Sequence, residues 1–254
     1  MRCRLDRICA DSQLSFGSSC IEVHVGTEPS VQRFAIHEKL ATSRSEFFKR
    51  AAKKPWTDLG GPVIPLPEDD ASVFNLYVIL TYTGSVATKG VALWHDPEEW
   101  KTQTRLYVLA EKLQDVWAKN RILDAMRHCL NPTINYGEAE AEADAARAWF
   151  ECRSTLDSLN ELYEGTPPSS PARRLIVDHY AGRIETKTLR AGKDTFPEDF
   201  VFDMAVRLMA QLPASSARGI SLQPSSRYRE TPKVTANAFG TAGDKKDAVI
   251  RGSQ

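Results

Sequence analysis

The sequence has no long hydrophobic run, no excess of charge of either sign and only five cysteines in its 254 residues. No window approaches the roughly 18 apolar residues that a membrane-spanning helix needs, so we expect no membrane segment. Lysine plus arginine and aspartate plus glutamate both number 33, which argues against a nucleic-acid coat or a membrane-surface binder. Residues 1–16 interrupt every apolar pair with a charged or polar group, which does not fit a secretory signal peptide.

The cysteines also lack the CxxC spacing of metal sites and redox motifs. They are Cys3, Cys9, Cys20, Cys129 and Cys152. Their odd number and spacing predict a reduced, intracellular protein, located in the cytoplasm, the nucleus or both. Cys3, Cys9 and Cys20 together with His24 come nearest to a zinc-binding set, but their irregular spacing differs from that of structural zinc sites. We therefore expect no metal and no cofactor.

Motifs of catalytic and nucleotide-binding sites are missing as well. The sequence contains no GxSxG, no HExxH and no Walker loop, and the lookalike GTAGDKK at Gly240 follows no predicted strand. We interpret Cys129, beside His128, as a buried thiol on an apolar helix face. Asp178 and His179 are adjacent on a predicted helix, and adjacent helical side chains do not face each other. We expect no catalytic residue, and an enzyme of unknown class is the remote alternative.

The residues that are present predict a mixed α+β fold. Residues 21–26 and 31–37 alternate apolar and polar side chains, which predicts a β-hairpin. The chain then changes to helical spacing as far as residue 54. The apolar side of this predicted helix consists of Leu40, Phe47, Phe48 and Ala51. Residues 63–66 (VIPL) predict a short strand, and Pro65 favours an edge position because proline cannot donate a ladder hydrogen bond.

The segment LPEDD precedes an apolar, aromatic helix that stops at Gly84. Asp69 or Asp70 can cap the first amides of this helix, and glycine readily takes the left-handed conformation that ends one. We therefore interpret these acids as capping residues and not as a catalytic pair. A further apolar face runs from Leu106 to Trp117, and another covers residues 122–130. The predicted core consists of Phe47, Phe74, Leu76, Tyr77, Leu80, Leu106, Leu109 and Leu113.

The composition changes after Asn131 and Pro132. Residues 137–165 favour a helix and carry eight carboxylates against two arginines. TPPSSP at residues 166–171 interrupts the helical pattern, and two more helical segments follow. After Pro213 few large apolar residues remain, which predicts disorder. The predicted organisation is a flexible segment at 1–19, a first domain at 20–131, a helical region at 137–212 and a disordered tail at 213–254.

Several of these motifs, in this order, resemble the BTB/POZ domain in the form common in filamentous fungi. The similar motifs are IH at Ile36–His37, RSEFF at 44–48, LPEDD, YTG at 82–84 and LAEKL at 109–113. The resemblance covers roughly residues 20–184 and includes the helical region after the domain. It implies a small mixed sheet flanked by a cluster of helices, followed by an all-helical extension. It also implies a protein–protein interaction module without catalytic activity.

Dimerising members of this family often carry an aspartate at the start of the first strand and a basic residue just after the histidine. Cys20 and Glu38 occupy these positions, and Glu38 follows His37 directly. Loss of both charges together is physically coherent, because one buried charge left without its partner would be costly. Residues 1–19 also lack the apolar stripe of a swapped helix. We therefore expect a monomer or weak self-association.

Members that bind a cullin scaffold share a hydrophobic-x-acidic element in a loop that corresponds to Trp56, Thr57 and Asp58. Trp56 is either an interface anchor or a cover for the edge of the core, because aromatic residues serve in both settings. The resemblance thus predicts a ubiquitin-ligase substrate adaptor, or else a general scaffold or transcription-associated protein without cullin binding. The candidate interaction residues are Trp56, Thr57, Asp58, His37, Glu38 and Cys20. The expected partners are other proteins, with no nucleic acid and no membrane.

Overall fold

The computed structural model describes residues 19–53, 63–88, 97–130, 153–181 and 184–211. All of them belong to one compact unit that covers residues 1–211. Four predicted features lie wholly or partly outside the described residues: the N-terminal segment before Ser19, the loop of residues 56–58, the acidic stretch at residues 137–152 and the tail after Pro213. The described part has the expected α+β class, with a small mixed sheet and a majority of helices.

The sheet has three strands in the order β2-β1-β3. They are β1 (Cys20–Val25), β2 (Gln32–His37) and β3 (Val63–Leu66). The antiparallel pairing of β1 with β2 confirms the predicted hairpin, and β3 lies parallel to β1 at the edge, as Pro65 indicated. Ile21, Val23 and Val25 are fully buried on one face of β1, because alternate side chains of a strand point to opposite faces.

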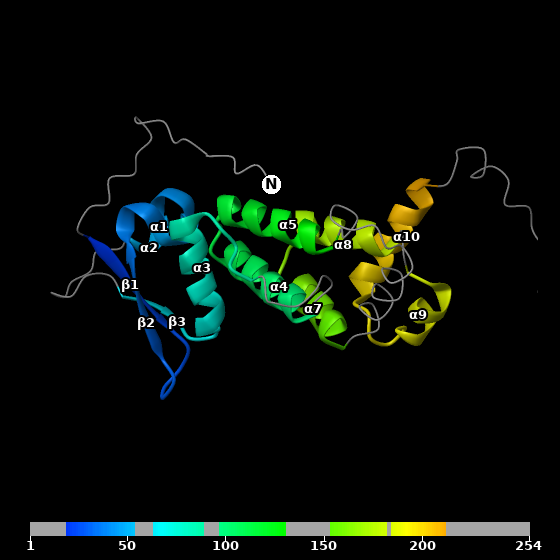
Figure 1. Ribbon diagram of the computed structural model, residues 1–254, viewed down its shortest axis with the longest axis horizontal. Helices are drawn as coiled ribbons and strands as arrows, with labels where there is room; N and C mark the ends of the chain where they lie inside the picture. Colours follow the sequence, from blue (N-terminus) through cyan, green and yellow to red (C-terminus); the bar gives the residue numbers. More distant parts are fainter. Residues whose placement is uncertain (1–18, 54–62, 89–96, 131–152, 182–183, 212–254) are drawn as a thin grey trace, which may run out of the picture. The chain divides into compact units, whose positions relative to one another are not determined.

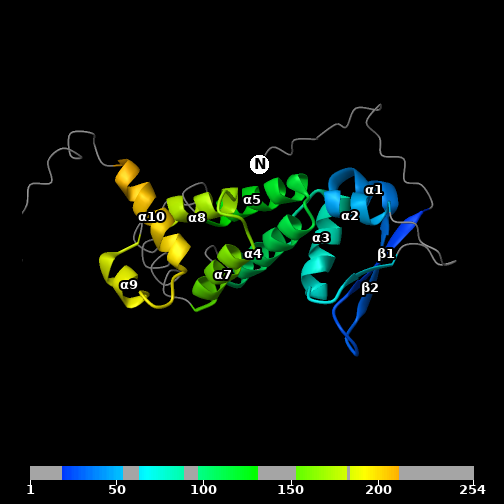
Figure 2. The same cartoon turned by 180° about the vertical axis from the view of Figure 1, so that it is seen from behind.

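Helices make up most of the described structure, and α3 (Ala71–Thr83) packs against the sheet. The described helices are α1 (Glu38–Arg44), α2 (Glu46–Ala51), α3 (Ala71–Thr83), α4 (Pro97–Lys112), α5 (Val116–Leu130), α7 (Arg153–Glu164), α8 (Pro171–Ala181), α9 (Thr186–Ala191) and α10 (Glu198–Gln211). Phe74 of α3 meets Phe34 of β2 with ring centroids 5.0 Å apart. Figure 1 shows α4 and α5 running side by side, and Figure 2 shows α8 beside α10 from behind. None of the described helices combines the length and the apolar character needed to cross a membrane.

Helix α3 follows the prediction from its sequence. Asp70 Oδ1 accepts a hydrogen bond of 2.7 Å from the Ser72 amide, and Gly84 ends the helix with a φ of 73°. Most of the predicted core is also confirmed. The buried members are Phe74, Tyr77, Leu80, Leu106, Leu109 and Leu113. The prediction was wrong for Phe47 and Leu76, which are only partly buried and pack against the edge of the core.

The single helix predicted between residues 37 and 54 is instead two helices separated by Ser45. Ser45 is extended, with φ −100° and ψ 120°, and its hydroxyl accepts a hydrogen bond of 3.1 Å from the Phe48 amide. The same hydroxyl donates to the carbonyl oxygen of Leu113 at 2.6 Å. Ser45 therefore starts α2 and fastens it to the end of α4.

The apolar face predicted from Leu106 to Trp117 is also divided between two helices. Helix α4 ends at Lys112, and Gln114 takes the left-handed conformation with a φ of 53°. Asp115 then accepts a hydrogen bond of 2.9 Å from the Ala118 amide and so begins α5. Trp117 consequently lies in the first turn of a new helix, where it is half-buried.

Candidate protein-interaction surface

Three of the predicted site residues lie together at the end of the sheet where α1 begins. Cys20 and His37 are register partners across β1 and β2, and the Glu38 amide donates a 3.0 Å hydrogen bond to the Ser19 carbonyl oxygen. Cys20 is exposed and forms no disulfide, whereas His37 and Glu38 are half-buried. Trp56, Thr57 and Asp58 lie outside the described residues, so their predicted role stays a prediction.

A tyrosine that sequence reasoning did not select as a site residue contacts this cluster. The His37 amide donates to Tyr82 Oη at 3.1 Å, and Tyr82 Oη lies 2.7 Å from His37 Nδ1. Because Oη accepts the amide proton, its own proton is available for Nδ1. Tyr82 keeps 43% of its surface exposed. Its position outside the buried face of α3 was the signal in the sequence that could have identified it.

Next to Tyr82 and His37 lies a tryptophan, Trp117, whose ring is contacted by two arginines. The guanidinium carbon of Arg44 lies 3.7 Å from the ring centroid of Trp117, and that of Arg121 lies 5.6 Å away. Arg44 also donates to the Thr81 carbonyl oxygen at 2.8 Å, next to Tyr82 in α3. Burial lowers the pKa of Arg44, and the nearby carboxylate of Asp115 opposes this shift.

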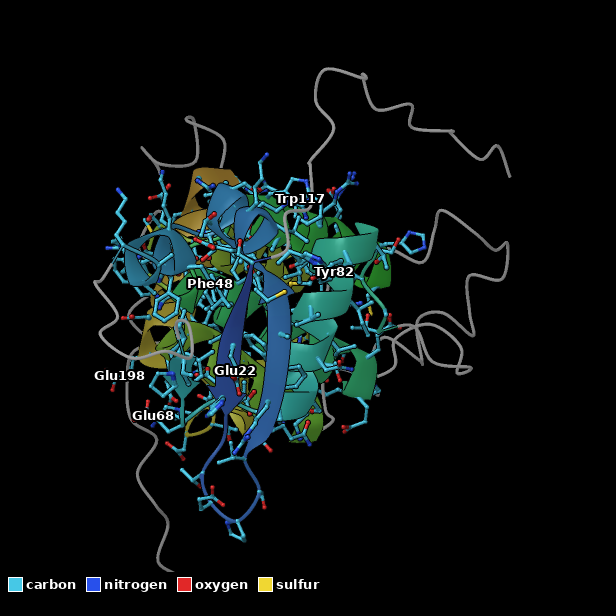
Figure 3. All side chains as sticks on the ribbon, turned by 90° about the vertical axis from the view of Figure 1, so that its left-hand side faces the viewer. Glu22, Phe48, Glu68, Tyr82, Trp117 and Glu198 are labelled. Atoms are coloured by element: carbon cyan, nitrogen blue, oxygen red, sulfur yellow. The ribbon has the colours of Figure 1, made fainter. Side chains whose placement is uncertain are left out.

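These contacts define one continuous surface, which we call the Tyr82–Trp117 surface. It consists of His37, Arg44, Tyr82, Trp117 and Arg121. Figure 3 shows Tyr82 and Trp117 near each other, and a Cβ atom added to Gly84 would lie 4.0 Å from the Trp117 ring. The surface therefore joins residues from β2, α1, α3 and α5.

A buried carboxylate supports this surface from behind. Asp115 has no exposed surface and accepts hydrogen bonds from the Tyr77 hydroxyl and the Ala118 amide, both at 2.9 Å. Burial raises the pKa of Tyr77, and the charge of Asp115 raises it further. Tyr77 thus stays protonated and ties α3 to the first turn of α5. This connection fixes Trp117 relative to Tyr82.

The other residues considered for chemistry make structural contacts. His24 Nε2 lies 2.7 Å from Glu22 Oε1, on the outer face of the sheet, and Asp178 forms an ion pair with Arg207. Cys129 is only half-buried, so the expectation of a fully buried thiol was wrong. Within the described residues, no three His, Cys, Asp or Glu side chains gather as a metal site would require.

The surface that remains is aromatic and cationic, with the half-exposed Tyr82 ring and the Arg121 guanidinium at its edge. A comparison of the sequence with protein-family models finds no match, and neither does a comparison with curated proteins. The Tyr82–Trp117 surface therefore has to be interpreted from its own chemistry.

Proposed function

We propose that this chain is a non-catalytic protein–protein interaction module of the BTB/POZ type. The observation that carries the proposal is the Tyr82–Trp117 surface. Tyrosine, tryptophan and arginine are the residues that most often dominate the binding energy of protein interfaces. Their large side chains lie here on a surface held by hydrogen bonds, so little conformational freedom is lost when a partner binds. The resemblance of the sequence motifs gives the same functional class.

The Tyr82–Trp117 surface favours a partner that supplies carboxylates or aromatic rings. Arg121 is exposed at its rim and Arg44 is stacked on Trp117. A carboxylate reaching this rim pairs with a guanidinium in the planar geometry that arginine favours. Dimerising members of the family carry an aspartate and a basic residue nearby, and this chain has Cys20 and Glu38 at those two positions. The charge pair that supports dimerisation is therefore missing. The preferred partner is therefore a different protein and not a second copy.

A role as a cullin-linked substrate adaptor is the more specific form of this proposal. It depends on the sequence of Trp56, Thr57 and Asp58, with Trp56 as the apolar anchor. Replacing Trp56 by alanine should then weaken cullin binding by more than about 1 kcal/mol without unfolding the chain. If wild-type protein binds no cullin, the chain acts as a scaffold through other partners.

A charge-reversal variant tests the general proposal. Tagged full-length chain is used to capture proteins from a fungal lysate, in wild-type form and as Arg121→Glu. Arg127→Glu is the matched control, because it makes the same exposed charge change six residues further along α5. Circular dichroism and urea unfolding of each variant establish that the fold is intact.

We expect Arg121→Glu to lose partners that both wild type and Arg127→Glu retain. The lost proteins are then purified and titrated individually, where a loss of at least about tenfold in affinity corresponds to roughly 1.4 kcal/mol. If Arg121→Glu and Arg127→Glu capture the same proteins as wild type, the Tyr82–Trp117 surface is not the docking site.

A further inference from the structure

A recess lies between the start of α3, the second half of α4 and the end of α7. It encloses about 490 Å³. The residues that line it are Glu68, Asp69, Asp70, Val73, Arg105, Val108, Leu109, Lys112, Glu161, Glu164 and Gly165. We call it the α3–α4–α7 groove. Figure 3 shows Glu68 near the lower edge of the ribbon, whereas Tyr82 and Trp117 lie in its upper part. The groove is therefore separate from the Tyr82–Trp117 surface.

The floor of the groove is apolar and closely packed. Val73, Val108 and Leu109 supply its aliphatic surface. Gly165 lets the end of α7 touch α4, since a Cβ atom there would lie 2.4 Å from Val108 Cγ1. Arg105 joins the same two helices through a 2.9 Å ion pair with Glu161. The groove is therefore already formed before any ligand binds, which reduces the entropic cost of binding.

The rim of the groove is acidic, with five carboxylates and two basic side chains. Both bases are already engaged: Arg105 pairs with Glu161, and Lys112 lies 2.7 Å from Asp69. Asp70 accepts from the Ser72 amide at the start of α3. Glu68 and Glu164 have no basic partner within the described part of the chain. The groove thus combines an apolar floor with three carboxylates, those of Glu68, Asp70 and Glu164, that neither base of its rim neutralises.

We propose that the α3–α4–α7 groove binds a short segment of a partner protein in which an apolar residue is flanked by lysine or arginine. The apolar side chain packs on Val73, Val108 and Leu109. The flanking bases pair with Glu68 and Glu164. An acidic segment would place its carboxylates beside Glu68 and Glu164, and the repulsion between like charges would weaken its binding. The rim therefore selects basic segments over acidic ones. This inference rests on the proposed function as an interaction module and adds a second docking site to it.

Fluorescence anisotropy with the full-length chain tests the groove directly. Three labelled peptides serve as probes: one that alternates arginine and leucine, one with glutamate in place of arginine, and one with serine in place of leucine. We expect binding of the arginine–leucine peptide, weaker binding of the arginine–serine peptide and none of the glutamate peptide. Raising the salt concentration should weaken the binding, because exposed ion pairs are screened.

Variants of the rim locate the binding site. Glu68→Gln and Glu164→Gln should each reduce affinity for the arginine–leucine peptide by about threefold, and by about tenfold together, in the range of exposed ion pairs. Glu198→Gln on α10 is the matched control, because Glu198 is exposed and does not line the groove. It should leave the affinity unchanged.

Three results would overturn the proposal: no binding of the arginine–leucine peptide, equal binding of the glutamate peptide, or unchanged affinity in the double variant. Arg121→Glu separates this proposal from the general one. If the groove is correct, Arg121→Glu binds the peptide like wild type, whatever it does to the proteins captured from a lysate. Failure of the peptide test alone leaves the Tyr82–Trp117 surface standing.

Discussion

Residues 19–130 and residues 153–211 are each fastened by one buried charged side chain, but the two charges have opposite signs. In the first region Asp115 accepts hydrogen bonds from the Tyr77 hydroxyl and the Ala118 amide. In the second, Arg173 is 4% exposed and donates to the carbonyl oxygens of Tyr163 and Thr166. It also donates to the Thr166 hydroxyl at 3.1 Å and lies 4.4 Å from the centre of the Tyr163 ring.

The two charges differ in sign because Asp115 binds the first amides of one helix, whereas Arg173 binds the last carbonyl oxygens of another. Asp115 lies before α5, where the first amides of a helix lack acceptors within it. Arg173 belongs to the first turn of α8, but its guanidinium reaches the end of α7, where the Tyr163 carbonyl oxygen lacks a donor within the helix. The helix dipole favours a negative charge at the first place and a positive charge at the second. In both regions a helix terminus thus supplies hydrogen-bond partners to a buried ionic group, and Arg173 has in addition a 3.5 Å ion pair with the exposed Asp199.

The largest expected effect comes from removing the arginine. Arg173→Met should lower the free energy of unfolding by about 3–5 kcal/mol, because several buried acceptors at the end of α7 lose their donor together. Arg174→Met is the matched control, since Arg174 is the exposed neighbour on α8 and should change stability by less than about 0.5 kcal/mol. Urea unfolding measures both. Equal losses in the two variants would contradict the assigned role of Arg173.

Removing the carboxylate should have a smaller effect. Asp115→Ala should cost about 2–3 kcal/mol, because α5 loses its cap and the buried Tyr77 hydroxyl loses its acceptor. Tyr77→Phe should cost less in the Asp115→Ala background than in wild type, with a coupling of about 1 kcal/mol in a double-mutant cycle. Asp124→Ala, at an exposed position of α5, serves as the control. Additive losses would mean that Tyr77 and Asp115 do not act together.

The smallest expected effect concerns an exposed helix cap and its dependence on pH. The hydrogen bond from Ser72 lowers the pKa of Asp70. The resulting stabilisation is therefore present above the aspartate pKa of the unfolded chain and is lost as the pH falls through the lower pKa of the folded state. Asp70→Asn keeps a capping side chain but cannot titrate. Between pH 7 and pH 3 the unfolding free energy of Asp70→Asn should therefore fall less than that of wild type, with a difference of about 1 kcal/mol or less. Parallel pH profiles of the two proteins would rule out a pH-dependent contribution from the Asp70 cap.

The features that could be predicted from the sequence are those that local chemistry determines. The cap at Asp70 and the left-handed Gly84 lie within a few residues of the helix that they bound. Cys20, His37 and Glu38 lie together because hairpin pairing, which the alternating pattern predicted, is also local and sets the register of β1 and β2. Such features depend on neighbours that are visible in a short window of sequence.

The missed breaks depend on residues far away in the chain. Ser45 interrupts a continuous apolar pattern because its hydroxyl reaches the carbonyl oxygen of Leu113, 68 residues further on. Gln114 turns the chain in a conformation that usually calls for glycine, so no glycine marked the end of α4. Phe47 was assigned to the core by its spacing alone, although the separation into two helices leaves it at the edge.

The interaction surface was only partly predictable for the same reason. Arg44 and Trp117 stack although they lie far apart in sequence, and no local pattern pairs a particular arginine with a particular aromatic ring. The burial of Arg173 did leave a signal, because it shares one helical face with Ile176 and Tyr180. That spacing distinguishes Arg173 from its exposed neighbour Arg174.

The contact between Gly165 and Val108 has a consequence for sequence variation. A Cβ atom at Gly165 would lie 2.4 Å and 2.8 Å from the two methyl carbons of Val108 and 3.1 Å from the Glu161 carbonyl oxygen. A branched valine side chain cannot rotate away from such a contact, because two of its staggered positions are always filled. In chains that descend from a common ancestor, alanine at position 165 should therefore occur together with alanine or glycine at position 108. The two positions should vary as a pair, and their covariation would record the packing of α7 on α4.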